Sequence, residues 1–170
     1  MNRFLSTVDK ISQKTGEMVS LLIFPMILII VYEVTMRYFF NNPTKWVFET
    51  ALFLFAASVI LSGCYVLKEH GHVGMDFFYL RLSIRKRATL DVITSFIFFA
   101  FIGVLLYQST IMAVDCWSIS ARSNSSWGPP IYPIVTTIPV AAFLLLLQGL
   151  AKLIRDLHLA ITGKDNRKAI

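Results

Sequence analysis

Long stretches without a charged residue are the feature that most constrains the fold of this 170-residue chain. A helix needs about 20 mainly apolar residues to cross the roughly 30 Å hydrocarbon core of a bilayer. Because lipid cannot satisfy backbone hydrogen bonds, such stretches are predicted to be helices rather than strands. The uncharged runs are 18–32, which ends at Glu33, and then 50–67, 92–114 and 123–151. The sequence therefore predicts four transmembrane helices, near 18–39, 46–68, 90–114 and 131–153.

The composition supports an all-α membrane protein. Hydrophobic residues make up 56% of the chain and charged residues 15%, whereas soluble domains carry about 25% charged residues. This excludes an ordinary soluble domain and a disordered chain. The two cysteines are too few to form a disulfide framework.

The distribution of basic residues predicts the orientation in the membrane. An even number of spans puts both termini on one side, and that side holds every lysine and arginine except Arg37, Lys45 and Arg122. The positive-inside rule therefore places both termini in the cytoplasm. The net charge of +6 indicates contact with anionic membrane lipids, and no nucleic-acid partner is expected.

Two segments outside the spans are amphipathic. Within residues 1–16, apolar side chains share one helical face, which predicts a short interfacial helix with Gly16 as the bend into the first span. A frayed terminus is the alternative. In the middle cytoplasmic loop, Asp76 stands at an N-cap position ahead of a second predicted interfacial helix. The predicted four-helix transmembrane domain covers 17–155, and a cytoplasmic tail covers 156–170.

The interiors of the second, third and fourth predicted spans contain no ionisable residue. Charged groups inside a membrane normally mark ion paths or substrate sites. The broken helix pairs of secondary transporters are also missing, since Pro25 and Pro139 lack accompanying glycine breaks. We therefore expect the chain to assist a partner rather than to transport a solute alone.

The exception is the outer end of the first helical hairpin. Glu33 and Arg37 are spaced i,i+4 with the acid first, and Lys45 and Glu49 repeat this spacing in the opposite order. The tight turn at 41–45 predicts that all four charges meet. Two interpretations stay open: a salt-bridge staple of the hairpin, or a contact surface for another subunit or a periplasmic partner.

Two further groups of residues are candidates for contacts. Ser58, Ser62 and Gly63 form a strip of small residues that permits close helix packing, either inside the chain or against another subunit. His72 and Asp76 lie together in the middle loop, but histidines spaced i,i+2 across a glycine are too unspecific to indicate a metal site. We interpret these two residues as part of an interfacial loop.

The two cysteines do not indicate redox chemistry. Cys64 and Cys116 are predicted to lie at opposite sides of the membrane, too far apart for a disulfide. No catalytic residue, cofactor site or metal site is expected in this chain, and we do not expect an enzyme.

Several short motifs occur in a characteristic order. They are Arg37-Tyr38, Trp46-Val47-Phe48-Glu49, Gly63-Cys64, Gly71-His72-Val73-Gly74-Met75-Asp76 and Ile138-Pro139. Together with the length and the predicted topology, this order resembles the small membrane subunit of TRAP (tripartite ATP-independent periplasmic) transporters, the DctQ-like family. The resemblance covers residues 15–155. One departure is Val140, which follows the proline of the last span where a glycine often stands.

This resemblance implies a scaffold role in a bacterial inner membrane. In that family a periplasmic substrate-binding protein captures an organic acid and delivers it to two membrane subunits. The large membrane subunit binds the solute and sodium and moves as an elevator, while the small subunit supports its static part. By similarity, Trp46 and Glu49 would help to fix the fold or the seam with the large subunit. The outer loops would face the binding protein, and this chain would hold no cofactor, since sodium is bound by the large partner.

Two other functions remain as alternatives. A single-chain, four-span small multidrug exporter has one acid in its first span, which Glu33 could imitate; proton-coupled export by this chain alone would favour it. A membrane thiol oxidase is the less favoured enzyme alternative, and full function of a Cys64→Ser, Cys116→Ser variant would exclude it.

Overall fold

The computed structural model describes residues 2–69 and 84–162, with side chains described for all of these except 2, 4, 84–89, 91 and 159–162. The described part forms five helices and one isolated β-bridge. Four helical stretches are long and apolar enough to cross a membrane, which confirms the predicted all-α membrane fold. The helices are α1 (Asn2–Ser20), α2 (Ile23–Tyr38), α3 (Val47–Lys68), α5 (Ile84–Ser118) and α6 (Tyr132–Thr162).

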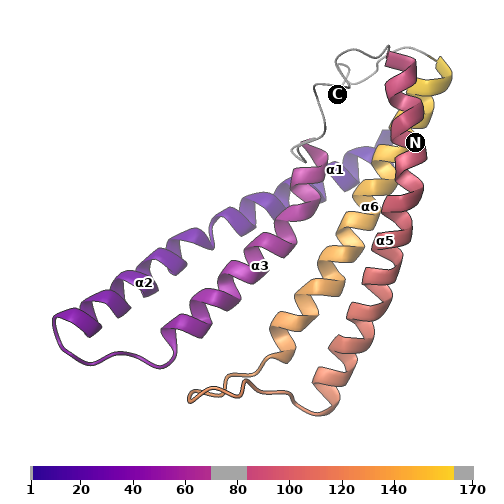
Figure 1. Ribbon diagram of the computed structural model, residues 1–170. Coiled ribbons are helices and arrows are strands. Elements are labelled where there is room, and N and C mark those ends of the chain that lie inside the picture. Colours follow the sequence, from indigo (N-terminus) through magenta and orange to yellow (C-terminus); the bar gives the residue numbers. More distant parts are fainter. Residues whose placement is uncertain (1, 70–83, 163–170) are drawn as a thin grey trace.

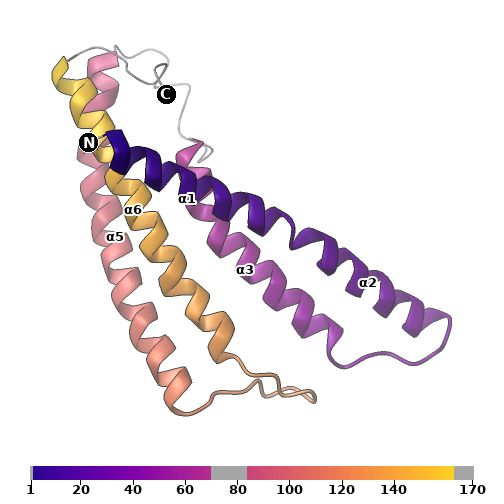
Figure 2. The ribbon, with the colours of Figure 1, turned by 180° about the vertical axis from the view of Figure 1, so that it is seen from behind.

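The helices are arranged as two antiparallel hairpins (Figure 1). α2 and α3 form the first hairpin, and α5 and α6 form the second, in which the two helices pack along most of their length. The hairpins approach each other through α3 and α6 and diverge toward their connecting loops. From behind, α1 is seen to cross both α6 and α3 at the other end of the molecule (Figure 2).

The predicted bend at Gly16 is wrong, because α1 continues through Gly16 and ends at Ser20. The break lies at residues 21–22, and Pro25 is its cause. Proline has no N–H to donate to the carbonyl four residues earlier, and its ring clashes with that carbonyl. The carbonyl of Leu21 instead accepts a hydrogen bond from the N–H of Phe24, only three residues later, at 3.3 Å.

Gly16 has a different role, which is to let α1 approach α3 closely. A Cβ atom at this position would lie 2.6 Å from Cγ and 2.9 Å from Cβ of Tyr65 on α3, closer than atoms can pack. A glycine lowers the stability of the helix itself, but at this position it permits close contact between the two backbones.

The amphipathic helix predicted within residues 1–16 is present as part of α1, and part of its apolar face packs within the chain. Leu5 and Val8 are buried against Ala151 of α6, with the side chains of Leu147 and Ile154 packed beside them. That α1 lies at the membrane surface stays a prediction.

The other helices agree with the predicted spans at some ends and extend beyond them at others. The prediction of 46–68 corresponds to α3, whereas α5 extends beyond 90–114 at both ends and α6 continues as helix past the predicted start of the tail at 156. The second interfacial helix predicted in the middle loop, with Asp76 as its cap, lies outside the described residues.

The contact between α1 and α3 can be tested by adding one methyl group. Gly16→Ala is expected to lower the free energy of unfolding by about 1–3 kcal/mol, because the new Cβ overpacks the base of the Tyr65 side chain. The measurement is the thermal unfolding midpoint of the purified protein in detergent.

Gly103→Ala is the matched control, since Gly103 is also helical but a Cβ there meets nothing within 4 Å. Its alanine is expected to be neutral or to stabilise by up to about 1 kcal/mol through helix propensity. Equal effects of the two substitutions would contradict the assigned role of Gly16.

Candidate functional site

The loop end of the first hairpin is closed by the carboxylate of Glu33. Its Oε1 accepts hydrogen bonds from Arg37 Nη2 at 2.6 Å and Arg37 Nε at 3.0 Å. Its Oε2 accepts the backbone N–H of Thr44 at 3.0 Å and also the Thr44 hydroxyl. The side chain of Glu33 is only 13% exposed. One carboxylate therefore ties the connection between the two helices back onto α2.

The prediction that four charges meet in one cluster is wrong. Lys45 is exposed and forms no ion pair with any described residue. Glu49 points instead to the α5–α6 connection, where the Ser123 hydroxyl donates to its Oε1 at 2.9 Å. The physical reason is that Glu49 lies in the first turn of α3, on a face that is turned toward the other hairpin rather than toward α2.

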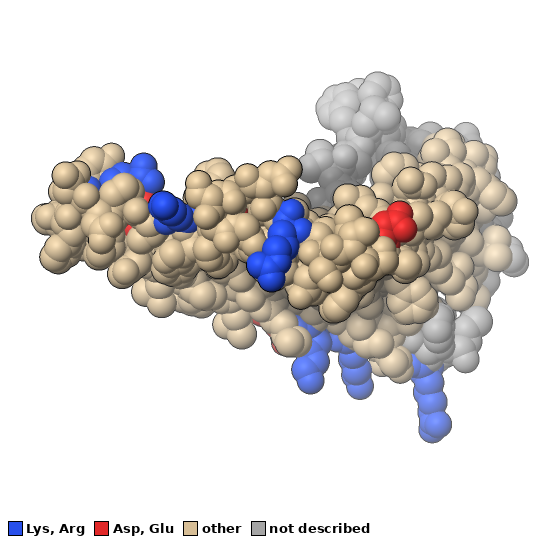
Figure 3. Space-filling view, turned by 90° about the horizontal axis from the view of Figure 1, so that it is seen from below, with Lys and Arg blue, Asp and Glu red and all other residues tan. Residues whose placement is uncertain are grey.

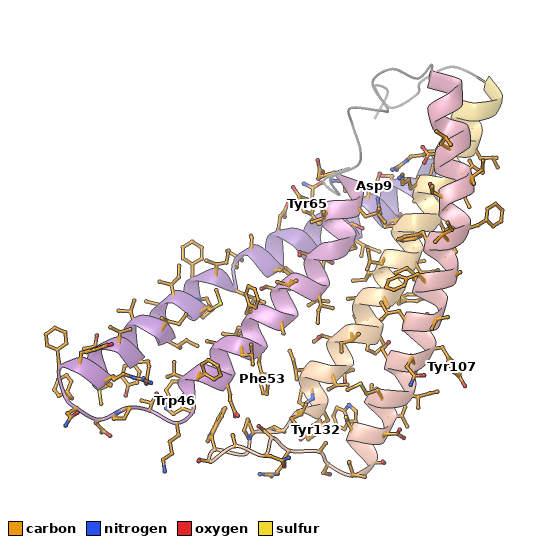
Figure 4. All side chains as sticks on the ribbon, in the orientation of Figure 1. Asp9, Trp46, Phe53, Tyr65, Tyr107 and Tyr132 are labelled. Atoms are coloured by element: carbon orange, nitrogen blue, oxygen red, sulfur yellow. The ribbon has the colours of Figure 1, made fainter. Side chains whose placement is uncertain are left out.

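Glu49 and the nearby Trp46 each have one further feature at the loop end. The Oε2 atom of Glu49 is buried and has no hydrogen-bond partner among the described residues. The ring of Trp46 lies 6.1 Å from that of Tyr32 on α2. Figure 4 shows Trp46 near the loop end of α3, with Phe53 farther along the same helix.

Ser123 is held in place by a compact loop. Its N–H donates to the carbonyl of Pro129 at 2.9 Å, and the N–H of Ile131 donates to the carbonyl of Ala121 at 3.0 Å. Gly128 has a φ of 62°, and its N–H donates to the Ser125 hydroxyl at 3.1 Å. This backbone pairing presents Ser123 to α3, so the Glu49–Ser123 bond links the two hairpins at their loop ends.

The loop-end face carries little charge. Seen from this end, the surface is mostly uncharged with scattered basic side chains (Figure 3). Of the basic residues here, Lys45 and Arg122 are exposed without an ion pair in the described structure, whereas Arg37 is bound to Glu33.

A second polar cluster lies where α1 crosses α6, and the sequence analysis did not predict it. The Ser12 hydroxyl donates to Gln148 Oε1 at 3.0 Å, and Gln148 Nε2 donates to Asp9 Oδ1 at 3.2 Å. Asp9 Oδ2 pairs with Arg155. Ser12 and Gln148 are 2% and 1% exposed. We call these four residues the α1–α6 polar link; Figure 4 shows Asp9 at this crossing.

The signal for the α1–α6 polar link was present in the sequence. Ser12 shares a helical face with Leu5 and Val8, so a hydroxyl is placed on the apolar side of α1. Gln148 is a strongly polar residue within a leucine-rich run of the last span. A buried amide needs a partner, and these two observations together would have pointed to an interhelical hydrogen bond.

The remaining predicted residues are placed as follows. Gly63 faces α6, where an added Cβ would lie 3.5 Å from Leu145, so it serves packing within the chain. The hydroxyls of Ser58 and Ser62 donate to carbonyls of their own helix, and a contact of these two with another subunit stays a prediction. His72 and Asp76 lie outside the described residues.

The cysteines and potential metal ligands show no cluster in the described part of the chain. Cys64 is buried and Cys116 half-buried, and both are free thiols. No group of three or more histidine, cysteine, aspartate or glutamate side chains is placed to hold a metal ion among the residues described.

The helical spans and their connections can now be compared with known proteins. Residues 26–159 match the family described as tripartite ATP-independent periplasmic transporters, DctQ component. The chain belongs to this family. The match includes most of α2, all of α3 and α5 and nearly all of α6, and it leaves α1 outside. The resemblance that the motifs predicted is thereby confirmed.

A curated relative agrees with membership of the DctQ family. The C4-dicarboxylate TRAP transporter small permease protein DctQ of Vibrio cholerae serotype O1 is 37% identical over 51 residues. This alignment covers 30% of the chain and 22% of the relative, so the chain matches about a fifth of the length of that protein.

The closure of the first hairpin can be tested at Glu33. Glu33→Ala is expected to destabilise the protein by about 1–3 kcal/mol, because Arg37 and the N–H of Thr44 both lose their acceptor. Lys45→Ala serves as the control and is expected to change stability by less than about 0.5 kcal/mol, since Lys45 is exposed and unpaired in the described structure. Thermal unfolding in detergent measures both variants, and equal stabilities would contradict the staple.

The α1–α6 polar link can be tested separately through the accessibility of α1 to protease. Gln148→Leu leaves Ser12 without its acceptor, and unpaired buried polar groups cost about 1–3 kcal/mol. Trypsin cleavage at Lys10 and Lys14 is therefore expected to accelerate about tenfold, as local opening of α1 becomes more frequent.

Gln108→Leu is the matched control for this measurement, because Gln108 is an exposed glutamine on α5 whose side chain forms no hydrogen bond with any described residue. It is expected to leave the cleavage rate of α1 unchanged. Equal cleavage rates for the two leucine variants would contradict a locking role of Gln148.

Proposed function

We propose that this chain is the non-catalytic small permease subunit of a TRAP transporter, and that it supports a large membrane subunit during sodium-driven uptake of an organic acid. The observation that carries the proposal is the family match over residues 26–159. The family description names a component of a periplasmic transporter, which implies a complex of several proteins. The V. cholerae relative is named for C4-dicarboxylates, so these are the first solutes to test.

The distribution of polar groups supports an assisting role. The described charged side chains of α3 and α5 lie near the helix ends, at positions such as Glu49, Lys68 and Asp115. In α6 they begin at Lys152, about 30 Å from Tyr132 by helical rise. Glu33 lies deeper in α2, but Arg37 and Thr44 already occupy both of its oxygens. Such an arrangement leaves coupling to an ion gradient to a partner, and we assign sodium binding to the large subunit and no cofactor to this chain.

The surface of the first hairpin supports a contact with the large subunit. α2 contains no buried residue, and its apolar side chains such as Phe24 and Leu28 are strongly exposed. Beside it, the ring of Trp46 lies 6.1 Å from that of Tyr32 on α2. We assign the seam to this surface, with Trp46 at its loop end, and Glu49 supports it from behind by joining the loop end of α3 to Ser123.

The orientation follows from charge. Thirteen of the sixteen lysines and arginines lie on the side of the termini and of the middle loop, which places both termini in the cytoplasm of a bacterium. The loop-end face, including the connection that contains Ser123, then faces the periplasm and the substrate-binding protein. No nucleic-acid partner is part of this assignment.

The transport function can be tested in proteoliposomes. The tagged chain, its large membrane partner and the periplasmic binding protein are expected to accumulate a C4-dicarboxylate only when all three are present and an inward sodium gradient is applied. The chain reconstituted alone is expected to accumulate nothing. Uptake without this chain, or proton-coupled export by this chain alone, would contradict the proposal, and the second result would favour the small-exporter alternative.

The seam is tested by charge reversal at one acid. Glu49→Lys is expected to reduce recovery of the large subunit on affinity purification at least tenfold, because a cation at this half-buried position removes the bond to Ser123 and displaces the loop end of α3 next to Trp46. Asp115→Lys is the matched control at the same end of the molecule, because Asp115 is exposed and its side chain forms no ion pair or hydrogen bond with any described residue. Full recovery with a folded Glu49→Lys variant would exclude the seam at this position.

A further inference from the structure

The exposed side of α1 carries a straight basic stripe. Arg3, Lys10 and Lys14 are all exposed, and at 100° per residue they fall within about 40° of the helix circumference. The buried residues Leu5 and Ser12 lie on the opposite side of the helix. Packing of α1 on the bundle therefore turns these three cations away from the rest of the chain.

The charge of this stripe is only partly balanced within the described structure. Asp9 pairs with Arg155 of α6, whereas Glu17, which borders the stripe, accepts a hydrogen bond from the neutral amide of Gln13 at 3.0 Å. The side chains of the stripe form no ion pair with the described residues. The outward surface of α1 is therefore strongly positive and lacks a partner in this chain.

Two contacts place α1 at the level where the spans leave the hydrocarbon core. Lys68, the last residue of α3, donates to Gln13 at 3.2 Å. Asp9 pairs with Arg155, which lies about 35 Å along α6 from Tyr132 by helical rise, beyond a core of roughly 30 Å. The stripe therefore lies at the depth of lipid headgroups.

The residues on either side of the stripe follow the polarity of a membrane surface. On one side the exposed Thr7 adjoins the stripe, and Ile11 and Met18, which are 41% and 64% exposed, follow it. Gln13 and Glu17 border it on the other side, and Gln13 is the one bound to the end of α3. The order of apolar, basic and neutral-to-acidic side chains around the helix matches acyl chains, phosphates and water. In Figure 3, basic side chains project from one edge of the molecule.

We propose that Arg3, Lys10 and Lys14 bind the phosphates of anionic phospholipids at the membrane surface. The occupant is lipid rather than a protein partner, because both the charge and the graded polarity around the stripe match a headgroup layer. α1 lies outside the residues matched to the DctQ family, so this site does not depend on the proposed transport function.

The test uses the full chain in lipid-free detergent, titrated with phosphatidylglycerol or phosphatidylcholine and analysed by native mass spectrometry. The wild type is expected to bind phosphatidylglycerol more tightly than phosphatidylcholine. Lys10→Gln with Lys14→Gln is expected to weaken phosphatidylglycerol binding about thirtyfold, because each basic residue near an anionic surface contributes about a fivefold factor in affinity. Binding of phosphatidylcholine is expected to be unchanged.

The matched control is Lys45→Gln with Arg122→Gln, which removes the same charge from two exposed residues at the loop end. It is expected to keep wild-type affinity for phosphatidylglycerol. A variant with Lys10→Arg and Lys14→Arg, which preserves the charge, is expected to keep it as well, and equal thermal unfolding midpoints without lipid show that the variants are folded.

Three results would overturn the proposal. They are equal affinity of the wild type for the two lipids, an undiminished affinity of the folded Lys10→Gln, Lys14→Gln variant, and an equal loss in the loop-end control. Loss of large-subunit recovery with unchanged phosphatidylglycerol binding would identify the stripe as a protein contact instead.

Discussion

The crossing of α1 over α3 and α6 holds the two hairpins together. α2 packs chiefly on α3, and α5 on α6, so the hairpins are joined mainly by the α3–α6 contact and by this crossing. Gly16 lets the backbone of α1 approach Tyr65 closely, while the buried bond from Ser12 to Gln148 fixes the rotation of α1 about its axis. Polar bonds are well suited to this task in a bilayer, because acyl chains are as apolar as a leucine face and apolar contact alone does not favour one helix orientation over another.

At the loop end of the molecule, fewer polar contacts connect the two hairpins. Glu33 closes its own hairpin with both oxygens occupied, whereas Glu49 reaches the other hairpin through a single bond to Ser123. Its second oxygen is buried without a donor in the described structure, and an unmet buried acceptor costs free energy until a donor is supplied. The two hairpins are therefore held less firmly at the loop end than at the crossing of α1, where the α1–α6 polar link satisfies its own buried groups.

Hydropathy predicted the spans well because the rule behind it is local, and α3 differs from its prediction by a single residue. Pairings between distant residues were beyond the same reasoning. Spacing along a helix shows which residues share a face, as for Lys45 and Glu49, but not which neighbour that face meets; Ser123 is 74 residues from its partner. The bend was misplaced because glycine only lowers helix stability, whereas Pro25 removes a hydrogen bond and so determines where the helix breaks. Gln148 was not predicted to form a contact because one amide among leucines barely changes the average hydropathy of the last span.

The break at residues 21–22 separates two helices that are held very differently. α1 is fixed to the bundle by the α1–α6 polar link, whereas α2 has no buried residue and packs chiefly on α3. The joint therefore allows α2 to change its tilt while α1 keeps its place. Tilting is how a spanning helix adjusts to bilayers of different thickness. The chain can thus adjust α2 to hydrophobic mismatch without disturbing the α1–α6 polar link between its two hairpins.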